Sequence, residues 1–132
     1  MPKINAFLIC DEVLSENNKK VIRGIFDTIY TKRLPITHPY FAIYLHMDIP
    51  KENEKGYKYK IEIKKEEEVI YSTDFFSVYT NKPRNQITHW VVKLTFKEEG
   101  RYDIYFYIKW LNGEENTIKN YFFVKIINKH GK

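Results

Sequence analysis

Hydrophobic and polar residues alternate along most of this chain, in segments separated by short polar turns. The clearest segment follows Gly100, where Tyr102, Ile104, Phe106 and Ile108 occupy every second position. Because successive side chains of a strand point to opposite faces, this alternation predicts strands with one buried face. No long stretch of the sequence places its apolar residues at helical spacing. The pattern therefore predicts an all-β protein.

The turn residues between these segments divide the chain into eight predicted strands. Proline cannot donate a hydrogen bond to a neighbouring strand, so Pro35 and Pro39 are expected to bracket a loop that crosses between sheets. The predicted strands are residues 4–14, 20–31, 40–49, 57–65, 69–79, 88–97, 101–111 and 116–127, and residues 128–132 form a short tail.

Tyr102 follows Gly100 by two residues at the start of its strand, a spacing typical of the corner tyrosine of immunoglobulin-like sandwiches. Its ring is expected to enter the core, and its hydroxyl to bond the backbone upstream. We therefore predict an immunoglobulin-like β-sandwich of seven to nine antiparallel strands, in one domain over residues 1–132. In that arrangement strands 40–49, 57–65, 101–111 and 116–127 share one sheet, and the others form the second. The predicted core consists of Phe41, Ile43, Leu45, Met47, Trp90, Val92, Leu94, Phe96, Tyr102, Ile104, Phe106, Ile108, Phe122, Val124 and Ile126.

The composition bears on the compartment, on membrane association and on the charge of any partner. Cys10 is the only cysteine, which excludes an internal disulfide and favours a reducing compartment, so a cytoplasmic protein is predicted. The apolar run at residues 4–10 is too short for a signal peptide or a membrane span, and no membrane association is expected. The net charge of +5 suggests at most weak attraction to anionic partners.

Aromatic residues are more numerous than a core of this size requires: the chain has 11 Tyr, 9 Phe and 2 Trp. Once the inward positions are assigned, the outward positions of the sheet that holds Tyr102 form the predicted partner-binding face. That face consists of Tyr40, Tyr44, His46, Tyr105, Tyr107, Lys109, Tyr121, Phe123 and Lys125. Exposed aromatic area of this extent favours an interface, most simply a homodimer or another protein partner.

Three alternatives remain open for this face. Single-stranded nucleic acid stacks on aromatic rings beside basic residues, and Lys58, Lys60 and Lys64 are predicted to lie next to the face. These three lysines have another possible role that does not concern the face: lysine is typical of an edge strand, where it prevents edge-to-edge aggregation. A carbohydrate could stack on the rings as well. Finally, Tyr and Phe could serve only to favour strands, covered by the chain itself.

Candidate catalytic residues are few, and each has a simple structural role. Cys10 and Asp11 are adjacent in a strand and point to opposite faces, so they cannot form one site. Asp27 follows an apolar run and is expected to point outward or to bond nearby backbone. His46 and Asp48 could supply two metal ligands to a metal-dependent enzyme, the least favoured class, but ligand spacing is lacking around His38, His89 and His130. We therefore expect no enzymatic activity, no metal and no cofactor.

Three segments carry a resemblance that covers nearly the whole chain: AFLICD at residues 6–11, GIFD at 24–27 with Ile29, and GRY at 100–102. With these segments the sequence resembles a family of small uncharacterised bacterial proteins catalogued as a domain of unknown function. The resemblance implies a stand-alone β-sandwich with no assigned activity, cofactor or catalytic residue. Relatives tend to have an Asp-Gly turn where this chain has three glutamates at residues 66–68.

Overall fold

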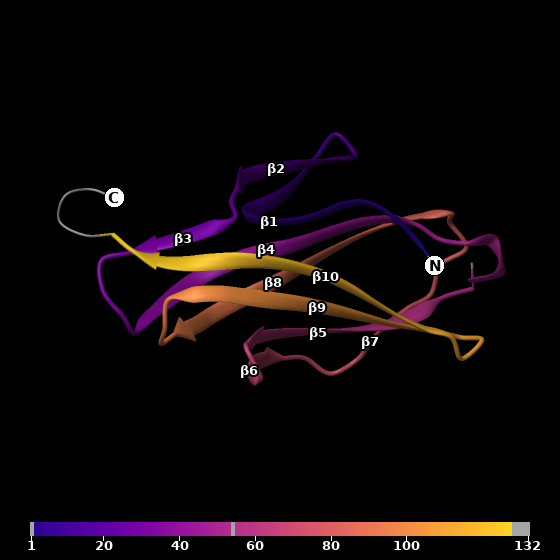
Figure 1. Cartoon of the computed structure of the whole chain (residues 1–132). Helices are drawn as coiled ribbons and strands as arrows, with labels where there is room; N and C mark the ends of the chain where they lie inside the picture. Colours follow the sequence, from indigo (N-terminus) through magenta and orange to yellow (C-terminus); the bar gives the residue numbers. More distant parts are fainter. Residues whose placement is uncertain (1, 54, 128–132) are drawn as a thin grey trace.

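The computed structural model describes residues 2–53 and 55–127, which are almost entirely β-strand (Figure 1). The predicted tail at 128–132, with His130, lies outside the described residues. No helix in the described part is long and apolar enough to cross a bilayer. The strands are β1 (Lys3–Glu16), β2 (Lys19–Ile25), β3 (Thr28–Thr31), β4 (Ile36–Asp48), β5 (Tyr57–Lys65), β6 (Glu68–Ser72), β7 (Phe76–Val78), β8 (Arg84–Phe96), β9 (Gly100–Trp110) and β10 (Glu115–Ile126), with one short 3-10 turn, η1 (Lys51–Asn53), between β4 and β5.

Two sheets form the fold, and the prediction of an all-β sandwich is confirmed. One sheet has the order β2-β1-β4-β8, and the other has the order β3-β10-β9-β5-β6, with β7 also paired to β5. The predicted sheet membership is wrong for two predicted strands. β4 pairs with β1 and β8, not with the sheet that contains β9. The predicted strand at residues 69–79 divides into β6 and β7, which both pair with β5 in the sheet of β9. The described residues form ten strands, so the predicted number of seven to nine is wrong, because two of the predicted strands each divide in two. The prediction of antiparallel pairing holds for every strand pair in this part of the chain except β3 with β10, which is parallel.

The predicted strand at residues 20–31 divides in two, and its halves join different sheets. Gly24 has a positive φ of 67°, and β2 ends one residue later, at Ile25, which is still paired with Cys10 of β1. The Phe26 amide still donates to the Ile9 carbonyl at 3.0 Å, but the Asp27 carbonyl accepts from the Phe123 amide of β10 at 2.9 Å. The chain therefore crosses between the sheets within two residues, and β3 begins at Thr28. In Figure 1, β3 lies beside β10 near the C-terminal end of that strand.

The predicted loop between the two prolines is also wrong, because β4 begins at Ile36 and contains Pro39. Pro39 stands opposite Lys93 of β8, where the register has no pair and Lys93 has a φ of 57°. This irregularity changes which face β8 turns inward. Val91 and Leu94 are both buried, whereas Trp90 and Val92 are exposed, contrary to the prediction.

The core between the sheets contains most of the predicted residues. Tyr102, Ile104, Phe106 and Ile108 of β9 are all at most 2% exposed, as predicted, whereas Ile126 is exposed and the prediction for it is wrong. The remaining buried members from the prediction are Phe41, Ile43, Leu45, Met47, Leu94, Phe96, Phe122 and Val124.

The corner tyrosine takes its expected place at one end of this core. The ring of Tyr102 packs against Phe96 and Phe122, with ring centroids 5.1 and 5.6 Å apart. Its hydroxyl donates to the Glu98 carbonyl at 2.5 Å, so the predicted corner hydrogen bond is confirmed. The bond joins the start of β9 to the turn that leaves β8.

Candidate functional site

The outer face of the six-stranded sheet carries aromatic and basic side chains from three neighbouring strands. β5, β9 and β10 lie side by side in Figure 1, and their register places the outward residues in rows across the sheet. We call this surface the basic aromatic face; it consists of Lys58, Lys60, Glu62, Lys64, Arg101, Asp103, Tyr105, Tyr107, Lys109, Glu115, Thr117, Lys119, Tyr121, Phe123 and Lys125. Six of the nine predicted partner-binding residues belong to it.

Aromatic rings and cations alternate across this face. Lys64 and Lys119 approach the ring of Tyr105 from either side, with Nζ 4.9 and 5.2 Å from its centroid. The Arg101 guanidinium lies 4.2 Å from the centroid of Tyr121. Tyr105 is half-buried as a result, so the expected continuous apolar patch is replaced by rings covered in part by cationic side chains. Arg101 and Lys119 were not predicted, although both share the odd-numbered parity of their neighbours on the face.

The acidic residue Glu62 contacts three side chains of this face. Glu62 lies 3.5 Å from Lys60 and 4.0 Å from Lys64, and it accepts a hydrogen bond from the Tyr107 hydroxyl at 3.1 Å. Burial, together with the adjacent Glu62 carboxylate, raises the pKa of Tyr107.

The face nevertheless carries an excess of positive charge. The described residues of its three strands place seven cations and three carboxylates on it, a surplus of four, against +5 for the whole chain. Lys58 and Lys109 stand directly opposite each other in neighbouring strands, and Glu115 of β10 stands opposite Lys109 on its other side. Like charges in that position repel, and a bound anion would relieve the repulsion.

The lysines of β5 do not protect an edge strand, so that interpretation is wrong. β5 lies inside the sheet, between β9 on one side and β6 with β7 on the other. Lys60 pairs across the sheet with Tyr107, and Lys64 lies opposite Asp103. These lysines therefore lie beside the predicted aromatic residues, which was the second prediction made for them.

Tyr40, Tyr44 and His46 are wrongly assigned to this face, because β4 belongs to the other sheet. Tyr44 is only 6% exposed and its hydroxyl donates to the Gln86 side chain at 2.8 Å. Tyr40 is exposed and packs edge-on against Trp90 of β8, with centroids 5.9 Å apart. Val92, opposite Tyr40 in the register, is also exposed. Tyr40, Trp90 and Val92 form a separate exposed apolar cluster.

The candidate chemical groups occupy separate places. The Cys10 thiol is fully buried, and burial, aided by the nearby Asp11 charge, raises its pKa, which disfavours the reactive thiolate. Asp48 pairs with Arg84 at 3.2 Å and accepts a hydrogen bond from Asn5, so its carboxylate is engaged beside His46. No group of three metal-ligating side chains gathers in the described part of the chain.

Asp27 is exposed at the point where the chain crosses between the sheets. Its carboxylate accepts a hydrogen bond from the Thr28 hydroxyl at 3.0 Å. The expectation of an outward position is therefore confirmed.

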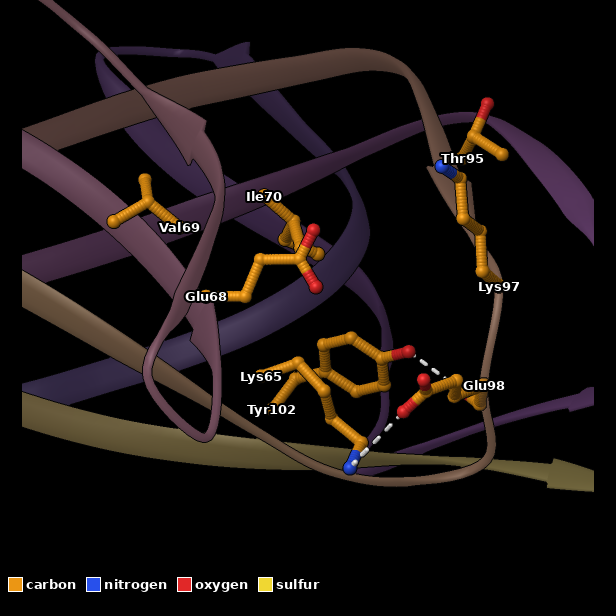
Figure 2. Close-up of a pocket in the computed structure, with 8 residues that line it drawn as sticks. All are labelled: Lys65, Glu68, Val69, Ile70, Thr95, Lys97, Glu98 and Tyr102. Atoms are coloured by element: carbon orange, nitrogen blue, oxygen red, sulfur yellow. Dashed lines mark hydrogen bonds and ion pairs between the residues drawn. The ribbon is translucent and has the colours of Figure 1, made fainter.

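A pocket opens beside the corner tyrosine, between β6 and the end of β8 (Figure 2). Its volume is about 250 Å³, and its polar groups come from Lys65, Glu68, Thr95, Lys97, Glu98 and Tyr102. Lys65 lies 3.8 Å from the Glu98 carboxylate, as Figure 2 shows, and the Tyr102 hydroxyl is bonded to the Glu98 backbone. Because three of its polar residues bind one another, this pocket serves first to close the corner of the sandwich.

The two packed sheets make this protein a β-sandwich, and the basic aromatic face lies on the outside of one of them. The chain matches the family of unknown function DUF6941 over residues 5–129 and belongs to that family. The resemblance drawn from the sequence to a domain of unknown function is thereby confirmed. The comparison with curated proteins finds no match. Among solved structures, the chain is similar to the soluble domain of PmoD from Methylocystis sp. ATCC 49242 (Rockwell), with 12% identity, 94% of this chain and 96% of that one covered, and a TM-score of 0.43.

Proposed function

We propose that this protein is a non-enzymatic binding module, and that its basic aromatic face binds single-stranded nucleic acid. The observation that carries the proposal is the alternation of cations with aromatic rings across three strands. Cations neutralise phosphates, and rings stack on bases without regard to sequence. Tyr121, at 46% exposed, is the most exposed ring of this face, and the Arg101 guanidinium lies over one side of it.

The positive charge of the face favours nucleic acid over the homodimer and the carbohydrate alternatives. A second copy docking on the same face would bring two surfaces together, each with a surplus of four positive charges among the described residues. Cations lying over the rings also favour an anionic ligand over a neutral sugar. A polyanion instead gains from every lysine on the face.

Fluorescence anisotropy with a labelled oligothymidylate, titrated at several salt concentrations, tests the proposal. Affinity should fall with salt, and Lys109→Ala or Lys125→Ala should each reduce the logarithmic salt slope by about 0.7. Tyr121→Ala should weaken binding about tenfold at constant slope, since it removes stacking and no charge. Lys19→Ala removes an equal charge from β2 of the other sheet and serves as the matched control.

Two outcomes would contradict this function. The first is the absence of binding at low salt. The second is an equal loss in the Lys19→Ala variant, which would mean that only the net charge of the chain matters.

A second candidate function has its own observation. The exposed cluster of Tyr40, Trp90 and Val92 offers an apolar surface suited to a protein contact on the other sheet. If wild type self-associates in light scattering, Trp90→Glu should shift it toward monomer, because burying an unpaired carboxylate is costly. A monomeric wild type at high concentration excludes self-association through this cluster.

A further inference from the structure

A second hollow lies where the chain crosses from β2 to β3, against β1 and the start of β4. Its volume is about 290 Å³. The residues of its lining used below are Asp11, Gly24, Ile25, Phe26, Tyr30 and His38. These residues come from four strands and the crossing between two of them, and they are remote in sequence from the basic aromatic face.

Asp11 supplies the charge in this hollow. A Cβ atom on Gly24 would collide with the Asp11 carboxylate, which therefore occupies the space that a side chain at position 24 would fill. Within residues 2–53 and 55–127, Asp11 forms no hydrogen bond and no ion pair. The hollow thus contains the exposed carboxylate of Asp11, which lies beside Gly24. No cation among the described residues pairs with its negative charge.

His38 stands close to that carboxylate without adding a positive charge. Its ring packs on Phe26 and Phe41, with centroids 6.5 and 5.8 Å apart. Burial lowers the pKa of His38 in spite of the opposing effect of Asp11, so the imidazole is neutral at pH 7 and can accept or donate a hydrogen bond.

Most of the remaining lining is apolar, and two of its large side chains are open to solvent. Ile25 is 61% exposed and Tyr30 is 59% exposed, although both are large apolar side chains. The half-buried Phe26 completes the wall beside His38. A few polar groups set into an apolar hollow are the usual composition of a small-molecule site.

We propose that this hollow binds a small organic ammonium ion, whose charge pairs with Asp11 and whose apolar body lies against Ile25, Phe26 and Tyr30. The carboxylate attracts a cation, and the aromatic rings reinforce that preference through cation–π attraction. The hollow is at the lower end of the size range of ligand sites, so it fits a fragment-sized amine. The site is independent of the nucleic-acid function proposed above.

Phenethylamine is a suitable probe, with 2-phenylethanol as the neutral molecule of the same shape. In a titration followed by 15N-resolved NMR, phenethylamine should shift the amide signals of Gly24, Phe26 and His38 together. The alcohol should bind at least about tenfold more weakly, because it lacks the charged group.

Variants then assign the binding to named residues. Asp11→Asn should weaken phenethylamine about tenfold, since it preserves shape and removes charge. Ile25→Ala changes an exposed side chain, is not expected to disturb folding, and should weaken both probes about threefold. Asp74→Asn removes an exposed carboxylate between β6 and β7 and should change nothing.

The proposal is overturned if Asp11→Asn and wild type bind phenethylamine equally. It is also overturned if the shifted signals lie away from the hollow, or if the alcohol binds as well as the amine. The amine titration does not depend on the oligonucleotide titration. A failure of the nucleic-acid proposal would therefore not contradict the amine site, and the reverse also holds.

Discussion

Removal of the Tyr102 hydroxyl tests the corner of the sandwich most directly. The ring is 2% exposed, and its hydroxyl donates to the Glu98 carbonyl at 2.5 Å. Tyr102→Phe keeps the ring contacts with Phe96 and Phe122 and deletes only this bond. One such bond contributes about 1 kcal/mol net, and an acceptor left without a partner adds up to about another 1 kcal/mol. Glu98 and Tyr102 line the adjacent pocket, so we expect water in it to bond the freed carbonyl and the total cost to be about 1 kcal/mol.

Chemical and thermal unfolding provide the assay. For 132 residues, an unfolding entropy of about 2.1 cal/mol/K per residue converts 1 kcal/mol into a fall of about 4 °C in Tm. The urea midpoint should fall by about 0.5 M with an unchanged m value. Tyr121→Phe is the control, because that exposed hydroxyl has no hydrogen-bond partner in the described part of the chain. Coincident midpoints for Tyr102→Phe and wild type would refute the structural role of the corner bond.

Two further predictions concern groups inside the fold. The Tyr71 hydroxyl lies 2.6 Å from His89 Nε2, and burial lowers the pKa of His89, so stability should be complete above about pH 6.5 and should fall as the pH drops below that unfolded-state value. His89→Gln should reduce the fall of the urea midpoint between about pH 7 and pH 5, and the part that remains includes the contribution of His38, whose pKa burial also lowers. An unchanged pH profile would contradict this assignment. Gly24→Ala should cost about 2 kcal/mol or more, because a positive φ and the Asp11 carboxylate both oppose a side chain. Gly113→Ala is its control, with a positive φ but open space for the Cβ, and an equal loss in the two variants would mean that no collision occurs at Gly24.

The alternation of the sequence determined which side chains of a strand share a face. Tyr102, Ile104, Phe106 and Ile108 were predicted inward and are buried, because parity within one regular strand is a local property. The tyrosine corner was equally local, since its hydrogen bond spans four residues. Parity failed at Trp90 and Val92, where the left-handed φ of Lys93 interrupts the strand, and an exposed lysine gives no sign of that in the sequence.

Only the tertiary structure decided which strands are neighbours and which residues distant in sequence come together. Alternation predicts that Tyr40 and Tyr105 each lie on one face of a strand, but not that their strands belong to opposite sheets. The parity of Lys119 could have placed it on the basic aromatic face, whereas its approach to Tyr105 depends on the register of β9 and β10. Asp11, Gly24 and His38 meet because the chain leaves one sheet for the other at that point. Such a crossing depends on long-range packing between sheets, which no local pattern of hydrophobic and polar residues encodes.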